Sequence, residues 1–211
     1  MSKPILYDYW RSSAAYRIRI ALNLKLIDYV AQPVDLLKGE HKGDLNLARN
    51  PQGLVPTLEI DGLVLTQSLP IIEYLDETRP DVPLLPADIR DRHRVRAIAA
   101  AIAMEIHPVC NMSVARYGTE LAGGDDLGPW MRHFIPKGLA AVEIMVAQGA
   151  TGGFCHLDAP TLADCCLMPQ LYNARRWGVD LEPYPTLRAV EAHCAELNAF
   201  QRAHPDAVAP K

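Results

Sequence analysis

The chain has 211 residues and a formal net charge of −4 at pH 7, and 49% of its residues are hydrophobic. These values are typical of a globular protein with one domain or two small ones. The negative charge and the lack of a Lys/Arg-rich run argue against a nucleic-acid partner. The first residues do not have the pattern of a signal peptide, and no apolar run reaches the roughly eighteen residues of a membrane span. We therefore expect a cytoplasmic protein without a membrane partner.

The cysteines argue against two further classes of protein. Their number is odd and their spacing shows neither CxxC nor a zinc-type pattern: they are Cys110, Cys155, Cys165, Cys166 and Cys194. A disulfide framework and a structural metal are therefore not expected. We interpret the adjacent Cys165 and Cys166 as buried small apolar residues.

The N-terminal part of the chain alternates strand-like and helix-like patterns. It predicts strand 4–9, helix 13–24, strand 29–34, short helix 41–48, strands 57–60 and 63–65, and helix 69–78. Asp61-Gly62 predicts a two-residue hairpin turn, because this pair accepts positive φ angles, and Ser68 is expected to cap the last helix. Strand–helix–strand followed by strand–strand–helix is the thioredoxin-like order, so we expect an α/β domain.

The strand pattern stops at the proline-rich stretch PDVPLLPAD. Residues 83–88 are expected to form a linker, because a helix cannot continue through these prolines. From residue 89 onward, apolar residues recur three and four apart, the spacing of one buried helix face. We therefore expect an α/β domain over residues 1–82 and an all-α domain over residues 89–211.

Several features are expected within the helical part. Pro108 should kink or end the first helix. Further helices are predicted over 127–147 and 186–200, and the tail 204–211 is expected to be loosely held. Thr161 followed by Asp164 at the third helical position predicts a capping box with a structural role.

The segment WRSSAAYRIRIAL places Ser12 and Ser13 where a strand turns into a helix. The first turn of a helix has unpaired N–H groups and a partial positive charge, so two hydroxyls there favour a thiolate or carboxylate ligand. A lone Ser-Ser pair before an apolar run is more often a plain helix cap. The nearby Arg11, Arg17 and Arg19 favour a small acidic ligand over a polyanion.

Three further positions have both a structural and a functional interpretation. Val55-Pro56 stands before a predicted strand, where proline is disfavoured, and a cis peptide bond would explain it. Ser68, after Gln67, offers a second hydroxyl at a helix N-terminus, which a plain cap also explains. A lone surface histidine such as His41 most often has no specific role.

Four blocks of the sequence resemble the zeta class of glutathione transferases, the maleylacetoacetate and maleylpyruvate isomerases. The blocks are WRSSAAYRIRIAL, NPQGLVPTLEIDGLVLTQSLPIIEYLDE, IHPVCNMSV and PTLADCCLMPQLYNARRWGVDLEPYP, in order from about Pro4 to Pro205. Glutathione transferases share the first two broadly, whereas their combination with the last two is specific to the zeta class. The resemblance implies a thioredoxin-like glutathione-binding domain, the helical C-terminal domain of the family, and glutathione as the cofactor.

The resemblance also implies which residues bind glutathione. Ser12 is the first choice for the hydroxyl that faces the sulfur, and Ser13 is the second. The Val55 backbone would pair with the cysteinyl peptide, Gln67 and Ser68 would hold the γ-glutamyl carboxylate, and His41 the glycyl carboxylate. The complete implied set is Ser12, Ser13, Ala14, Ala15, Tyr16, Arg17, His41, Val55, Gln67, Ser68, His107, Asn111, Met112 and Ser113. In zeta relatives the counterparts of the last four line the cleft, on a helix that should face the first domain.

The implied reaction is cis–trans isomerisation of a maleyl keto-acid in aromatic catabolism, including tyrosine degradation. The glutathione thiolate adds to the activated double bond, the resulting single bond rotates, and elimination returns glutathione and the fumaryl product. The substrate is a small dicarboxylate, so cations are needed. Ser12, Ser13, Arg11 and Arg176 are the implied catalytic residues, whereas Arg175 is interpreted as a surface arginine.

The chain departs from the zeta pattern at two places. Ala14 and Ala15 stand where zeta enzymes commonly have a cysteine and a hydroxyl residue, which removes any protein thiol from the site. Ser113 stands where several bacterial relatives carry arginine, and a serine there also occurs in animal maleylacetoacetate isomerases. We therefore favour maleylacetoacetate, with maleylpyruvate as the alternative substrate.

Two rival functions remain open at this level. One is general conjugation of electrophiles to glutathione, and the other is a non-catalytic binding module with the same fold. A module would be expected to lose the hydroxyls or the γ-glutamyl pair, and this chain keeps Ser12, Ser13, Gln67 and Ser68. A homodimer is expected from the family.

Overall fold

The computed structural model describes residues 3–149 and 152–210, which divide into two units. The first unit comprises Met1–Leu84 and Glu196–Lys211, and the second comprises Leu85–Ala195. The sequence predicts a single helical domain over residues 89–211. The last part of the chain departs from that prediction because its helices pack in the first unit.

The first unit is built on a four-stranded mixed sheet. Its strands, in the order β2-β1-β3-β4 across the sheet, are β2 (Val30–Pro33), β1 (Ile5–Asp8), β3 (Thr57–Ile60) and β4 (Leu63–Thr66). Strand β1 runs parallel to β2 and antiparallel to β3, and β3 runs antiparallel to β4. Asp61 and Gly62 both have positive φ angles, of 54° and 79°, as the predicted hairpin turn requires. The thioredoxin-like arrangement is confirmed.

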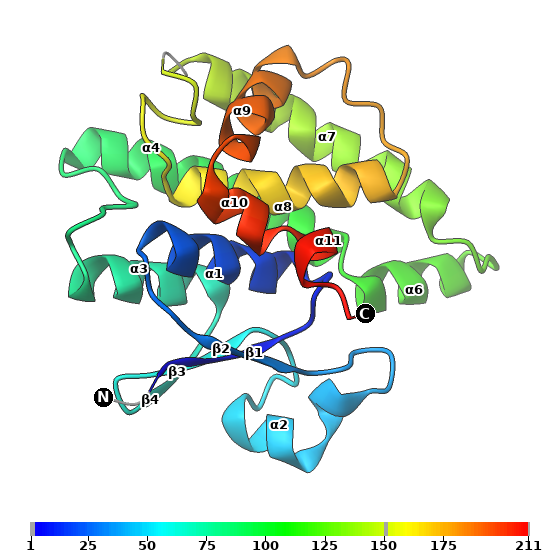
Figure 1. The fold of residues 1–211 in the computed structure, drawn as a ribbon. Coiled ribbons are helices and arrows are strands. Elements are labelled where there is room, and N and C mark those ends of the chain that lie inside the picture. The colour runs from blue at the N-terminus through cyan, green and yellow to red at the C-terminus, as the bar shows by residue number, and fades with distance from the viewer. Residues whose placement is uncertain (1–2, 150–151, 211) are drawn as a thin grey trace. The chain divides into compact units, whose positions relative to one another are not determined.

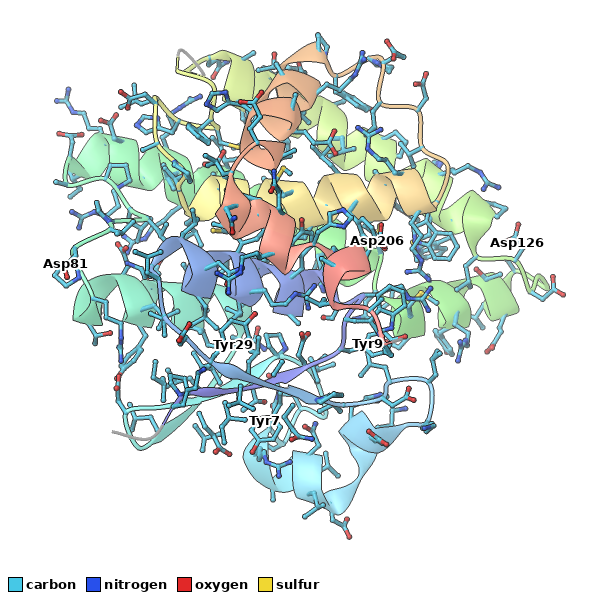
Figure 2. All side chains as sticks on the ribbon, viewed as in Figure 1. Tyr7, Tyr9, Tyr29, Asp81, Asp126 and Asp206 are labelled. Atoms are coloured by element: carbon cyan, nitrogen blue, oxygen red, sulfur yellow. The ribbon has the colours of Figure 1, made fainter. Side chains whose placement is uncertain are left out.

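The helices of the first unit are α1 (Ser13–Leu24), the 3-10 helix η1 (Glu40–Lys42), α2 (Asp44–Arg49), α3 (Ser68–Thr78), α10 (Asn198–Ala203) and α11 (Pro205–Val208). Helix α10 packs on α1 and α11 packs on α10. Helices α1 and α3 lie on one face and α2 on the other (Figure 1). Figure 2 shows Tyr7 of β1 on the face toward α2, where the Arg49 guanidinium carbon stacks 4.1 Å from its ring. The α1 side is the more deeply buried, because Ile18, Ala21 and Leu22 pack there without exposed surface.

The predicted loose tail is wrong for the residues described. Within residues 204–210 the chain forms helix α11, which packs on α10, and Pro205 is buried. Helix α10 in turn packs on α1, with Phe200 and Ala203 buried. The predicted helix 186–200 is also wrong as one element, since α9 (Pro185–Ala195) ends before α10 begins. The two helices belong to different units, so the break is where the chain leaves one core for the other.

The second unit is a helical bundle. Its helices are α4 (Ile89–Ala100), a π-helical stretch η2 (Ala101–Ile106), α5 (His107–Val109), α6 (Met112–Leu121), α7 (Gly128–Ala147), α8 (Leu162–Arg176) and α9. The predicted face of the first helix is confirmed, because Val95, Ile98 and Ile102 are fully buried. That helix continues through Pro108 for one residue and ends at Val109.

No single described helix has the length and apolar character of a membrane span. The segments Ile89–Val109 and Met112–Leu121 have that length and character only together, and they meet at a bend of 43°.

Candidate glutathione site

Three segments with polar side chains meet at one end of the sheet. In the strand register Tyr7 of β1 pairs with Thr57 of β3, which pairs with Thr66 of β4. The Ser12 turn follows β1, Val55-Pro56 precedes β3, and Gln67-Ser68 follows β4. The antiparallel pairing therefore brings these segments to the same end of the sheet. The Val55-Pro56 peptide bond is cis, as predicted.

Ser12 is the N-cap of α1. Its Oγ accepts a hydrogen bond of 3.2 Å from the Ala15 N–H, and its carbonyl accepts the first intrahelical bond from Tyr16 at 2.9 Å. Because Oγ is the acceptor in this bond, the hydroxyl hydrogen remains available for a ligand. Ser13 is the first helical residue, and both serines are half-buried. The capping interpretation is therefore correct, and the same geometry leaves a donor at the positive end of the helix.

Arg11 precedes this cap and is also half-buried. Its guanidinium carbon lies 4.7 Å from the centre of the Trp10 ring, and its Nη2 donates a 3.4 Å hydrogen bond to the Tyr9 hydroxyl. Its buried Nε has no hydrogen-bond partner among the described residues. A buried guanidinium N–H of this kind is suited to a carboxylate, which accepts from two donors of one arginine.

The start of α3 forms the second anion-binding element. Gln67 is its N-cap and has a φ of +67°, while Ser68 is the first helical residue and not the cap that the sequence predicts. Ser68 is buried, and its Oγ accepts a 3.1 Å hydrogen bond from Nη1 of the buried Arg17. A hydroxyl beside a guanidinium at a helix N-terminus favours a carboxylate. A strained backbone such as that of Gln67 is typical of a ligand site.

Gln52 is a polar residue at this end of the sheet that sequence reasoning missed. Its Oε1 accepts a 2.6 Å hydrogen bond from Nε2 of Gln67, and both side chains are exposed. It lies in the NPQG stretch just before Val55-Pro56, so its position after a helix and before the cis proline is the signal that could have found it.

His41 lies in η1, next to the same segment. A Cβ added to Gly53 would come within 3.3 Å of the His41 carbonyl, and that carbonyl accepts a 2.9 Å hydrogen bond from Asn46. Its buried Nδ1 has no hydrogen-bond partner in the described part of the chain. Burial, and secondarily the charge of Lys42, lowers the pKa of His41 below 6.5, so the ring is neutral near pH 7.

The remaining predicted residues of the first unit differ in accessibility. Ala14 is half-buried, whereas Ala15 and Tyr16 are buried. The Tyr16 ring packs edge-on against His204 at 6.0 Å between centroids, so its side chain is directed to the C-terminal helices. A role for Ala15 and Tyr16 in ligand binding would therefore have to come from their backbone.

The other predicted residues belong to the second unit. Asn111 caps α6, and its Oδ1 accepts hydrogen bonds from the N–H and the hydroxyl of Ser113 at 3.0 and 2.8 Å. Met112 and Ser113 are exposed, and His107 is half-buried in α5. Arg176 ends α8, with its guanidinium carbon 5.0 Å from the Trp177 ring centre. The neighbouring Arg175 pairs instead with Glu191, as expected for a surface arginine.

The residues of the first unit fit glutathione chemically. Two helix N-termini carry hydroxyls at one end of the sheet, and Arg11 and His41 each keep a buried, unpaired polar nitrogen in the described structure. Glutathione offers two carboxylates, a thiol and peptide groups, which match these donors. No described group of three or more His, Cys, Asp or Glu side chains could hold a metal ion.

The fold with this site is that of a glutathione transferase. The model of the family "Glutathione S-transferase, N-terminal domain" matches residues 11–78. Maleylacetoacetate isomerase of Rhizobium meliloti (strain 1021) is 57% identical over 211 residues, 99% of each chain. A holo structure of maleylpyruvate isomerase, described as a bacterial zeta-class glutathione transferase, is 46% identical with a TM-score of 0.94 over 98% of this chain and 99% of that one.

A third similar structure contains bound glutathione. The structure of maleylacetoacetate isomerase from Anaeromyxobacter dehalogenans 2CP-1 with glutathione in its active site is 50% identical, with a TM-score of 0.89 over 99% of this chain and 98% of that chain. This chain belongs to the zeta-class glutathione transferase family, as its sequence motifs predict.

Proposed function

We propose that this protein is a glutathione-dependent cis–trans isomerase that converts maleylacetoacetate to its fumaryl isomer. The observation that supports this most directly is the end of the sheet where the Ser12, Val55 and Ser68 segments meet. That arrangement occurs in a chain 57% identical to a maleylacetoacetate isomerase over its full length.

In this proposal the first unit holds glutathione. The Ser12 hydroxyl donates to the sulfur while its oxygen is fixed by Ala15, and Ser13 adds a second donor at the helix end. Both favour the thiolate over the thiol, whose pKa of about 8.5 would otherwise leave only a few per cent ionised at neutral pH. The γ-glutamyl carboxylate is assigned to Gln67 and Ser68. We add Gln52 because its side chain is bonded to Gln67.

Further contacts to glutathione are part of the proposal. His41 binds the glycyl carboxylate, and the Val55 backbone pairs with the cysteinyl peptide. The second unit is proposed to contribute His107, Asn111, Met112 and Ser113.

When bound, glutathione would supply a thiolate that adds reversibly to the activated double bond of the substrate. Arg11 and Arg176 are proposed to bind the two carboxylates and to stabilise the charge that develops on the carbonyl oxygen. The unpaired Nε of Arg11 supports its part in this role.

Maleylpyruvate is the second candidate substrate, because a maleylpyruvate isomerase structure has the same fold at 46% identity. Position 113 holds a serine and not an arginine, and its hydroxyl donates a hydrogen bond to Asn111. This serine supports maleylacetoacetate as the substrate. We further propose a cytoplasmic homodimer without membrane or nucleic-acid partners.

The deciding experiment incubates the protein with maleylacetoacetate or maleylpyruvate, with and without glutathione, and follows the fumaryl product. We expect isomerisation of maleylacetoacetate that requires glutathione and returns it unconsumed. Turnover without glutathione would overturn the mechanism. Retention on immobilised glutathione without any isomerase activity would favour the binding module, and activity only on an electrophile panel would favour a conjugating transferase.

A further inference from the structure

Arg19 in the middle of α1 is a buried cation that the proposed chemistry does not use. It has no exposed surface. Its Nη1 donates to both carboxylate oxygens of Asp8 at 2.8 Å, its Nη2 to the Trp10 carbonyl at 2.9 Å, and its Nε to the Ala203 carbonyl at 2.9 Å. The sequence groups Arg19 with Arg11 and Arg17 as cations for an acidic ligand. For Arg19 this is wrong, because Asp8 neutralises it inside the first unit.

The contact with Trp10 belongs to the turn that leads to Ser12. In the three consecutive residues before Arg11 and Ser12, which are Asp8, Tyr9 and Trp10, each backbone carbonyl accepts a hydrogen bond. The Asp8 carbonyl accepts from the Val34 N–H at 2.7 Å, and the Tyr9 carbonyl from the Ser12 N–H at 2.8 Å. The Trp10 carbonyl accepts from Arg19. Backbone N–H groups therefore hold the carbonyls of Asp8 and Tyr9, and the Arg19 side chain, from further along α1, holds that of Trp10.

The same guanidinium also holds the C-terminal segment. Its bond to the Ala203 carbonyl links α1 to α10, as does the 3.0 Å bond from Asn23 Nδ2 to the Ala199 carbonyl. Arg19 thus joins the end of β1, the Ser12 turn and α10 through one rigid planar group. Lysine could not reproduce this, because its single ammonium lacks the fixed fork of a guanidinium.

On the basis of the function proposed above, we infer that Arg19 is a positioning residue for the reaction. Held by Asp8, it fixes the Trp10 peptide and so sets where the Ser12 hydroxyl stands relative to the sulfur of glutathione. The physical reason is that a hydrogen bond to a charged atom depends steeply on distance and direction, so a donor displaced by a fraction of an ångström loses much of its effect. Arg19 itself touches neither glutathione nor the substrate.

Lys25, just beyond the other end of α1, is a matched control. It is also buried, and its Nζ donates to one carboxylate and two carbonyls: Asp76 at 2.9 Å, Arg79 at 3.0 Å and Val82 at 2.8 Å. Its contacts resemble those of Arg19 in number and kind, but none involves the Ser12 turn. Losing Arg19 deprives the buried Asp8 of its guanidinium, and losing Lys25 deprives the half-buried Asp76 of its ammonium, so both losses are expected to destabilise the fold.

The test compares Arg19→Lys and Arg19→Met with Lys25→Met. The thiol pKa of bound glutathione is read from thiolate absorbance against pH, and kcat and KM are measured on folded protein. We expect the Arg19 variants to raise the thiol pKa by about one unit, and to lower kcat/KM about tenfold mainly through kcat. Lys25→Met should lose comparable stability and leave both values as in the parent protein.

The outcomes separate this inference from the proposed function. If Ser12→Ala raises the thiol pKa and Arg19→Lys does not, Arg19 is only structural and the inference is overturned. If Ser12→Ala itself leaves the thiol pKa unchanged, the proposed role of Ser12 fails and the inference with it. If Lys25→Met raises the thiol pKa as much as Arg19→Lys, the effect reflects general destabilisation and again overturns the inference. Should Arg19→Met not fold, the lysine variant, which keeps the positive charge, decides alone.

Discussion

Among the described helices, α1 and α8 both begin with a hydroxyl N-cap, and they use it differently. At α8, Thr161 Oγ1 accepts from the Ala163 N–H at 3.2 Å, and the fully buried Asp164 accepts from the Thr161 N–H at 2.7 Å, completing the predicted capping box. At α1, Ser12 makes a corresponding cap, but the first turn contains no acidic residue and both serines are half-buried.

The difference shows what turns a helix cap into a ligand site. At α8 a carboxylate of the protein occupies the positive end of the helix, and the cap is closed. At α1 the equivalent position is empty of protein charge, so an external anion can take it. The signal lies less in the capping hydroxyl than in the absence of a carboxylate three residues further on.

The largest expected effect tests the closed cap. Asp164→Ala should lower the free energy of unfolding by roughly 3–5 kcal/mol, because it leaves the N–H groups of Cys155 and Thr161 and the Thr161 hydroxyl without their buried acceptor. Urea denaturation measures this. The folded variant should still bind glutathione with the affinity of the parent protein. A decrease of less than about 1 kcal/mol in the free energy of unfolding would contradict a structural role for the cap.

The open cap should give the reverse pattern. Ser12→Ala removes one capping acceptor, which costs about 1 kcal/mol of stability, and it removes the proposed donor to sulfur, which should lower kcat/KM about a hundredfold. Steady-state kinetics with maleylacetoacetate measures the second effect, with Ser13→Ala as the neighbouring control expected to lose less. Full activity together with an unchanged thiol pKa would remove Ser12 from the mechanism.

Sequence signals predicted those parts of the fold that depend on local chemistry. The helix over 13–24, the Asp61-Gly62 hairpin and the Thr161 capping box all follow from residues within a few positions of one another. The break after Ala195 and the docking of α10 on α1 do not. They depend on which of two cores buries Phe200, and periodicity within one helix carries no information on that choice.

Some residues of the candidate site could likewise be predicted from local sequence, and others could not. Ser12, Gln67 and Ser68 stand at strand-to-helix junctions, so their place at the end of the sheet could be predicted from the order of elements. The contacts of Gln52 and Arg19 could not. Gln52 approaches Gln67 only after the chain turns back, and a buried arginine cannot be distinguished from a ligand-binding one by its neighbours in sequence.

A smaller effect is expected at His41, which is proposed to bind the same external ligand as the open cap of α1. Burial holds the pKa of its ring below 6.5 in the free protein, so the ring is neutral at pH 7.5 and becomes charged as the pH falls. A glycyl carboxylate would favour the charged ring, so affinity should rise as the pH falls through that pKa. S-methylglutathione, which has no thiol to titrate, should bind about fivefold more tightly at pH 5 than at pH 7.5 in calorimetry. His41→Gln should abolish this pH dependence, and a dependence that persists in the variant would assign it to another group.

The smallest expected effect concerns the sulfur atoms of the protein. The first turn of α1 contains no cysteine, and all five cysteines of the chain are free and buried. Burial raises the pKa of Cys110 to about 11 and also raises those of Cys155 and Cys194, so their thiolates are scarce at pH 8. Iodoacetamide at pH 8 should therefore leave the native protein unmodified by mass spectrometry and fully active, whereas all five thiols should react in urea. Alkylation of one native cysteine with matching loss of isomerase activity would place a protein thiol in the reaction and contradict the assignment of the reactive sulfur to glutathione alone.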